Sequence, residues 1–176
     1  MKRATPLRLT PILVIILTPP PQPLSAQETD HAACPMHAAH AAKDVDRRGD
    51  QVMGFAHSAT THHFRLTKDG GAIEIAAIDA GDSASVAAIR SHLTAVAEAF
   101  GRGDFAMPEA IHGELPPGAE TLAARRAELD YRYEETAAGA RVRILARTPE
   151  SLAAVYEFLR YQIAEHRTGD SREPAS

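Results

Sequence analysis

The chain has 176 residues, a formal net charge of -4 with neutral histidines, and only 5% aromatic residues. This composition lacks the basic surface and interleaved aromatic residues of nucleic-acid-binding proteins, so we expect no nucleic-acid partner. Its single cysteine, Cys34, excludes a disulfide within the chain. That cysteine must be a free thiol, a bridge to another chain or a metal ligand.

Residues 1–26 have the pattern of a secretory signal peptide. Lys2 and Arg3 precede a short apolar run at residues 12–17, and a proline-rich stretch ends at Leu24-Ser25-Ala26. The order of basic, apolar and small residues is typical of such signals, and the run is too short to span a bilayer. We predict cleavage after Ala26 and a periplasmic or secreted protein with no transmembrane segment in the mature chain. An uncleaved amphipathic anchor is the alternative.

The remainder divides into an arm, a domain and a tail. Residues 27–50 are rich in alanine and charge but have no sustained apolar period, so we predict a flexible arm there. We place one domain at residues 51–168 and a disordered tail at residues 169–176. A segment as long as this domain can bury a proper hydrophobic core.

Two hairpins are predicted within the domain. Residues 61–66 and 72–78 alternate in polarity around the turn Lys68-Asp69-Gly70-Gly71. Residues 129–135 and 141–147 do the same around Ala137-Ala138-Gly139. Alternating strands separated by glycine-containing turns are the usual signal of antiparallel hairpins.

A helix is predicted after each hairpin. The first is capped by Asp82 or Ser83 and ends at Gly101-Arg102-Gly103, with apolar residues at helical spacing in between. The last is opened by Thr148-Pro149-Glu150, a cap followed by a proline in the first turn. We expect a loop at residues 105–118 and a shorter helix at residues 119–126.

The two halves of the domain resemble each other. Ile73-Glu74-Ile75 matches Val142-Arg143-Ile144, and the helices that follow have similar apolar patterns. We therefore predict an α+β fold in which duplicated ββα units form a four-stranded antiparallel sheet with two main helices on one face. A coincidence between two ordinary amphipathic segments is the alternative, and it leaves the fold class unchanged.

A cluster of soft metal ligands follows the predicted signal. Cys34-Pro35-Met36-His37 supplies a thiolate, a thioether and an imidazole within four residues. Soft donors favour Cu(I) or Zn(II) over Ca(II) or Mg(II), so we expect copper or zinc as the bound metal. A solvated linker that contains these residues by chance is the alternative.

This motif resembles the core of the small heavy-metal-binding modules attached to bacterial copper and silver efflux proteins. Here Ala38 stands where those modules have proline. The resemblance implies Cys34, Met36 and His37 as ligands and a soft metal as cargo. It implies nothing about the surrounding fold.

A second cluster contains Met53, His57, His62 and His63. If residues 53–57 form a helical turn, the thioether and the imidazole of that turn share one face. His62 and His63 are neighbours on a strand and must point to opposite faces, so only one can serve the same ion. The alternative for either is a hydrogen-bonded polar residue at a strand end.

Several short stretches of the domain resemble a group of exported bacterial proteins with no established activity. They are Met53-Gly54-Phe55, Thr60-Thr61-His62-His63-Phe64-Arg65-Leu66, Gly70-Gly71, Ile111-His112-Gly113 and Pro116-Pro117-Gly118. The resemblance implies a discrete exported domain and no enzyme class.

The sequence favours a periplasmic transition-metal protein, with copper preferred, for sequestration, delivery or sensing. The sequence motifs of common hydrolases, metalloproteases and nucleotide-binding enzymes are absent. A metal-dependent enzyme using His57, His62 or His63 and His112 is one alternative, and an envelope interaction module without metal is another. Homodimerisation is also expected, because open sheet edges attract partners. We expect structural roles for His92 and His166.

Overall fold

The computed structural model of the protein describes residues 35–175, with side chains from residue 43 onward. The predicted signal peptide and Cys34 lie outside these residues. The helices are α1 (Pro35–Met53), α2 (Ser83–Gly101), α3 (Ala106–His112), α4 (Ala119–Ala124) and α5 (Pro149–Glu165). The strands are β1 (Thr60–Thr67), β2 (Gly70–Ala77), β3 (Leu129–Thr136) and β4 (Gly139–Ala146). The short 3-10 helices η2 (His57–Ala59) and η3 (Arg126–Glu128) precede β1 and β3.

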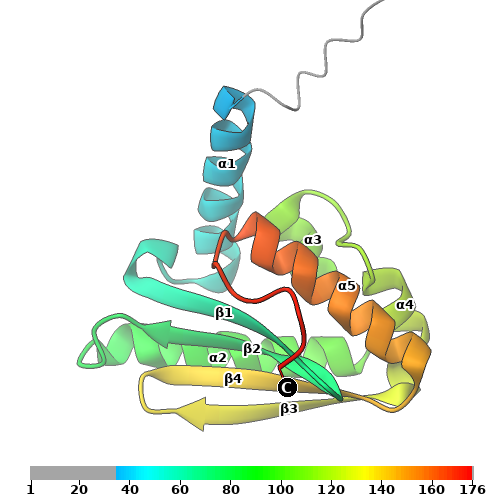
Figure 1. Cartoon of the computed structure of the whole chain (residues 1–176). Helices are drawn as coiled ribbons and strands as arrows, with labels where there is room; N and C mark the ends of the chain where they lie inside the picture. The colour runs from blue at the N-terminus through cyan, green and yellow to red at the C-terminus, as the bar shows by residue number, and fades with distance from the viewer. Residues whose placement is uncertain (1–34, 176) are drawn as a thin grey trace, which may run out of the picture. The chain divides into compact units, whose positions relative to one another are not determined.

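The four strands form one antiparallel sheet in the order β1-β2-β4-β3 (Figure 1). Each hairpin pairs with the other through its second strand, and this contact lies in the middle of the sheet. The α+β fold predicted from the sequence is therefore confirmed. Figure 1 also shows α3 and α4 beside α5.

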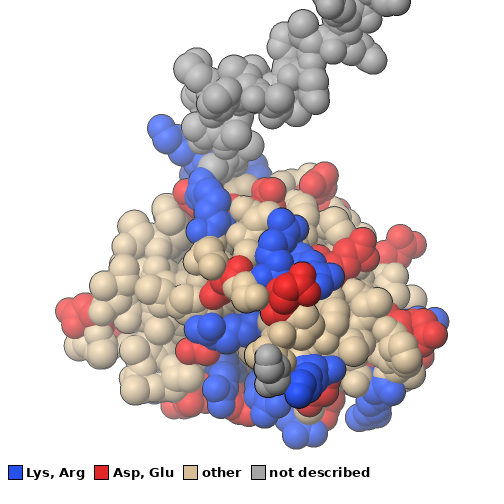
Figure 2. Space-filling view, in the orientation of Figure 1, with Lys and Arg blue, Asp and Glu red and all other residues tan. Residues whose placement is uncertain are grey.

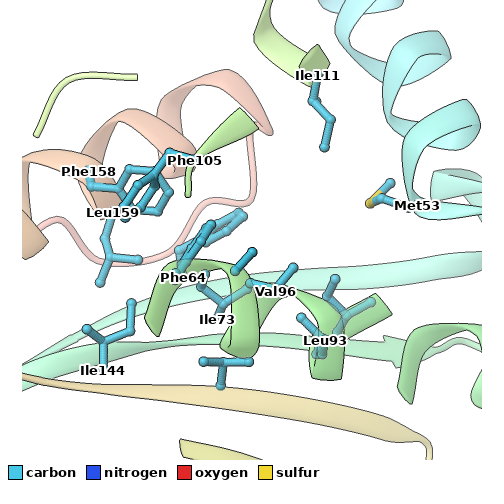
Figure 3. Packing of buried hydrophobic residues seen from close by; sticks show 14 of the residues in the cluster. Met53, Phe64, Ile73, Leu93, Val96, Phe105, Ile111, Ile144, Phe158 and Leu159 are labelled. Atoms are coloured by element: carbon cyan, nitrogen blue, oxygen red, sulfur yellow. The ribbon is translucent and has the colours of Figure 1, made fainter. Parts of the chain in front are cut away.

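Both main helices cover the same face of the sheet. The buried residues Phe64, Ile73 and Val142 come from three neighbouring strands and point to this face. In Figure 3, Phe158, Phe105 and Leu159 lie on one side and Met53 on the other. The side chains of Phe64, Ile73 and Val96 lie between them. The opposite face carries mostly polar and charged side chains, as expected for an antiparallel sheet with one solvated face.

The pairing of the central strands follows the internal repeat. Ile73 of β2 pairs directly with Val142 of β4, its counterpart in the second half. A Cβ atom on Gly70 would collide with the carbonyl oxygen of Ile144, and one on Gly139 would collide with that of Ile75. Gly70 and Gly139 occupy equivalent positions in the repeat. Each unit therefore has a glycine where the backbone of the other unit's strand approaches closely.

The helix boundaries agree with their capping signals. Asp82 caps α2, and its side chain accepts a hydrogen bond from the backbone N–H of Ser85. Thr148 caps α5, with Pro149 in the first turn. The loop expected at residues 105–118 instead contains α3. Pro108 lies in the first turn of that helix, where a missing N–H costs no hydrogen bond.

The structure also differs from the expected arm and tail. Residues 35–53 form α1, which buries Val45, Gly49 and Met53 at four-residue spacing. The side chain of Arg48 donates hydrogen bonds to the carbonyls of Ile111 and His112 at 2.6 and 3.0 Å. A helix face built around a glycine and an arginine has a weak apolar period, which is why the sequence pattern missed it.

The C-terminal segment runs along the open edge of β1 (Figure 1). Asp170 accepts a hydrogen bond from the backbone N–H of Phe64 at 2.9 Å, and Ala175 donates one to the carbonyl of Leu66 at 3.0 Å. These bonds satisfy edge groups that would otherwise attract another strand. The division of the chain into signal, arm, domain and tail stays a prediction, but residues 170–175 contact the sheet.

Among residues 35–175, no helix is long and apolar enough to cross a membrane. Figure 2 shows acidic and basic side chains interspersed over the visible face. Homodimerisation and binding of an envelope protein stay predictions.

Replacement of Gly118 by alanine is expected to lower the free energy of unfolding by about 1–3 kcal/mol. Gly118 has a φ of 81°, and a Cβ there would lie 2.5 Å from the carbonyl oxygen of Ala154. Gly101→Ala is the matched control, because a Cβ at Gly101 meets nothing within 4 Å. Urea unfolding followed by circular dichroism measures both. Equal stability of the two variants would contradict the expected crowding at Gly118.

Candidate functional site

A cavity of about 50 Å³ lies between the sheet and its covering helices. We call it the interior cavity. It is lined by Met53, His62, Phe64, Ile73, Ile75, His92, Leu93, Val96, Phe100, Met107, Pro108, Ile111, His112, Phe158, Gln162 and His166. Its wall is therefore largely apolar, with four imidazoles, two thioethers and one amide. A space of this volume can hold an ion or a water molecule.

Four different elements supply the imidazoles. His62 comes from β1, His92 from α2, His112 from the last turn of α3, and His166 follows the end of α5. The rings of His62 and His166 stack with centroids 5.7 Å apart, and those of His112 and His166 meet edge to face at 5.2 Å. Residues far apart in sequence thus form one imidazole cluster.

The alternation of β1 separates the two neighbouring histidines. His62 points to the covered face, where its ring also stacks near Phe55 at 6.3 Å. His63 points to the other side, and its Nδ1 lies 2.9 Å from a carboxylate oxygen of Asp170. Of the two, only His62 reaches the interior cavity.

Two nitrogen atoms of the cluster are buried without a hydrogen-bond partner. These atoms are Nε2 of His62 and Nδ1 of His112. Nε2 of His112 donates to Oε1 of Gln162 at 3.0 Å, so in the neutral ring Nδ1 keeps its lone pair. Buried polar atoms of this kind are rare in folded proteins and point to a missing ligand or water.

Burial keeps these rings neutral at physiological pH. It lowers the pKa of His62 and His92 to about 4, with the nearby His92 adding to the effect on His62. The pKa of His166 falls to about 3, through burial and then the proximity of His62. Burial also lowers the pKa of His112. A neutral imidazole is the form that binds a metal ion.

Met53 and His57 do not share a helical face. Helix α1 ends at Met53, and Gly54 then adopts a φ of 79° before η2 begins at His57. Met53 is buried at the interior cavity, whereas His57 lies outside it, with Nδ1 at 2.9 Å from Asp50. Nε2 of His57 lies 3.6 Å from a carboxylate oxygen of Asp46. The turn considered at residues 53–57 is therefore not formed.

His57 and His63 instead line an open groove of about 260 Å³. We call it the outer groove. Its lining residues are Asp46, His57, Thr60, Thr61, His62, His63, His166, Arg167 and Thr168. His112 is absent from this lining and belongs to the interior cavity. The histidines considered for an enzyme site are thus divided between two spaces.

Residues 35–37 of the Cys34-Pro35-Met36-His37 motif are distant from Met53 along the helix. Cys34 lies outside the described residues, and residues 35–37 form the start of α1. At about 1.5 Å per residue, the helix places the backbone of His37 roughly 24 Å from that of Met53. Residues 36 and 37 therefore cannot share one ion with Met53 while α1 stays helical.

The sequence pattern missed His92, His166 and Met107 as cavity residues. Each stands alone in the sequence, at a helix end or the border of an apolar stripe, so no local spacing indicated it. Within residues 35–175, no three His, Cys, Asp or Glu side chains are grouped as a metal ion would require. No family model, curated protein or solved structure matches this chain.

Proposed function

We propose that the protein binds a soft transition-metal ion, with Cu(I) preferred, in the interior cavity. The observation that carries this proposal is the pair of buried nitrogen atoms without partners, Nε2 of His62 and Nδ1 of His112. Both residues line a cavity that also receives the thioethers of Met53 and Met107. Two imidazoles and a thioether form a donor set suited to a soft ion.

Energetics support an occupant for this cavity. A buried polar atom without a hydrogen bond costs about 1–3 kcal/mol. Two such atoms beside one cavity destabilise the empty protein, and a bound cation would accept both lone pairs. The free energy recovered by pairing these atoms then adds to the affinity for the ion.

The donor types favour Cu(I) over Zn(II). Zinc takes a tetrahedral ligand set drawn mainly from Cys, His and carboxylates. In the part of the chain that the structure describes, no three such side chains are suitably grouped. Cu(I) accepts fewer ligands and binds thioethers well, so His62, His112 and Met53 suffice for it.

We propose a separate role for Cys34, Met36 and His37 as an outer capture site in an exported protein. Residues 36 and 37 lie at the opposite end of α1 from Met53, so ions would pass between two distinct sites. Sequestration or delivery in the periplasm fits such an arrangement, since both tasks need a capture step and a protected store.

Competition with a chromogenic Cu(I) chelator tests the proposed cavity site. We expect the double variant His62→Ala, His112→Ala to lose affinity for one Cu(I) equivalent by at least about 100-fold, because it removes both nitrogen ligands. The control His57→Ala, His63→Ala changes two histidines of the outer groove and is expected to retain that equivalent. Circular dichroism confirms that each variant is folded.

The capture motif is tested in the same assay by Cys34→Ala, His37→Ala. This variant is expected to lose a different equivalent and to keep the one held in the cavity. Full Cu(I) binding by the His62→Ala, His112→Ala variant would show that the cavity is not a copper site. Loss of all Cu(I) binding in the motif variant would assign the metal to the N-terminal motif instead.

A further inference from the structure

The outer groove and the interior cavity share two lining residues, His62 and His166. All other lining residues belong to only one of the two spaces. The shared rings stack nearly parallel, with an interplanar angle of 11° and centroids 5.7 Å apart. These two imidazoles therefore lie where the groove and the cavity adjoin.

The backbones of these two residues lie in different kinds of structure. His62 lies within β1 and pairs with Ile75 of β2, so its backbone is fixed by the sheet. His166 directly follows Glu165, the last residue of α5. Chain segments at helix ends open more readily than the middle of a strand, so we expect His166 to be the more mobile of the two residues.

An ion pair holds the chain directly after His166. Arg167 has a φ of 53°, the only positive φ of a non-glycine residue among those the structure describes. This left-handed residue closes the C-terminus of α5, because the N–H of Arg167 donates to the carbonyl of Ala164 and that of Thr168 donates to the carbonyl of Ile163, both at 3.3 Å. Its guanidinium donates to both carboxylate oxygens of Asp46 on α1, at 2.9 and 3.0 Å. The ion pair ties this turn to α1.

We infer that the outer groove is the entrance to the interior cavity, that His166 is its gate, and that the Asp46–Arg167 pair is the latch. This inference rests on the proposed function, because the ion that passes is the Cu(I) of the cavity. When the pair separates, the turn after α5 is released from α1 and His166 moves away from His62. Nε2 of His62 is then the first buried donor that an ion meets from the groove.

Stopped-flow transfer of Cu(I) to and from a chromogenic chelator tests the gate. We expect Arg167→Ala to accelerate uptake and release of Cu(I) by a similar factor of about ten. The ion pair is present in both the metal-free and the metal-loaded protein, so its loss lowers the barrier to opening in both and leaves their relative stability unchanged. The equilibrium affinity should stay within about twofold. Arg160→Ala is the matched control, since Arg160 lies on α5 but bonds to the carbonyl of Arg172.

A charge exchange provides the second variant. In Asp46→Arg, Arg167→Asp the ion pair is rebuilt with reversed polarity, and aspartate tolerates a positive φ better than most residues. We expect this variant to restore slow transfer, whereas Asp46→Asn alone should transfer rapidly. Equal rates in all of these variants and the wild type would overturn the latch.

Modification of His166 by diethyl pyrocarbonate tests the gate without any metal. Mass spectrometry should show slow modification in the metal-free wild type and several-fold faster modification in Arg167→Ala, with the half-buried His57 of the outer groove as the reference. Faster modification together with no Cu(I) binding would support the gate and reject the proposed metal. Cu(I) binding with unchanged modification and unchanged transfer rates would reject the gate and leave the metal site standing.

Discussion

Acidification from pH 7 to pH 4 is expected to lower the free energy of unfolding of the metal-free protein by several kcal/mol. Buried His62 and His92 have a folded-state pKa of about 4, and His166 one of about 3, against 6.5 for an exposed histidine. As the pH falls below about 6.5, these histidines become protonated in the unfolded chain but stay neutral in the folded protein. Stability is therefore fully present above that pH and is lost as the pH falls.

The size of this effect follows from the pKa difference. A difference between 6.5 and about 4 corresponds to roughly 3 kcal/mol for one histidine, at about 1.4 kcal/mol per pH unit. Neighbouring rings repel each other once charged, so their contributions are not independent. Native domains are stable by only about 5–15 kcal/mol, so the loss can unfold the protein.

Urea unfolding at a series of pH values measures this loss. Carboxylates with a lowered pKa, such as Asp50 and Asp170, lose their contribution at lower pH, so the interval between pH 6.5 and 4 belongs to the histidines. The variant His166→Phe should reduce the slope in that interval. A constant stability from pH 6.5 to 4 would contradict the burial of the imidazole cluster.

The second large effect is expected for Phe158→Ala, which should lower the free energy of unfolding by about 3–5 kcal/mol. Phe158 is 1% exposed and packs edge to face against Phe100 and Phe105, with ring centroids 5.8 and 5.7 Å away. It also lines the interior cavity, which the truncation would enlarge. Surrounding helices and strands hold the walls apart, so little of the new space can collapse.

Ile78→Ala is the control for this truncation, because Ile78 is a large apolar residue that is 67% exposed. Its removal should change the free energy of unfolding by no more than about 0.5 kcal/mol. Chemical denaturation of both variants, followed by circular dichroism, makes the comparison. A loss below about 1 kcal/mol for Phe158→Ala would contradict the tight packing of this aromatic group.

The sequence was most informative where one local rule decides the structure. Alternation identified both hairpins, and the caps Asp82 and Thr148 marked the starts of α2 and α5. The match between Ile73 and Val142 led to the correct sheet. Each hairpin has one apolar face to bury, so the two hairpins pair and bury these faces in one core. Helix α1 was missed since its buried face depends on Gly49 packing near α3, a contact with no local signal.

The site was harder to predict from the sequence, because it too depends on contacts between residues far apart in the chain. Adjacent His62 and His63 indicated that one histidine must face the core, and the register of β1 identified it as His62. His92 and His166 were assigned structural roles, because a lone histidine on a helix gives no indication of its neighbours. Only the packing of α2, α3 and α5 on the sheet brings their rings together. The ligand roles of Cys34, Met36 and His37 stay predictions.

The most direct test of the central proposal is a crystal structure of the Cu(I)-loaded protein with anomalous diffraction data collected at the copper absorption edge. We expect a copper peak in the interior cavity, within bonding distance of Nε2 of His62 and Nδ1 of His112, with a methionine sulfur as a further ligand. A cavity that holds only water beside these nitrogen atoms, with copper bound elsewhere on the chain, would contradict the proposal.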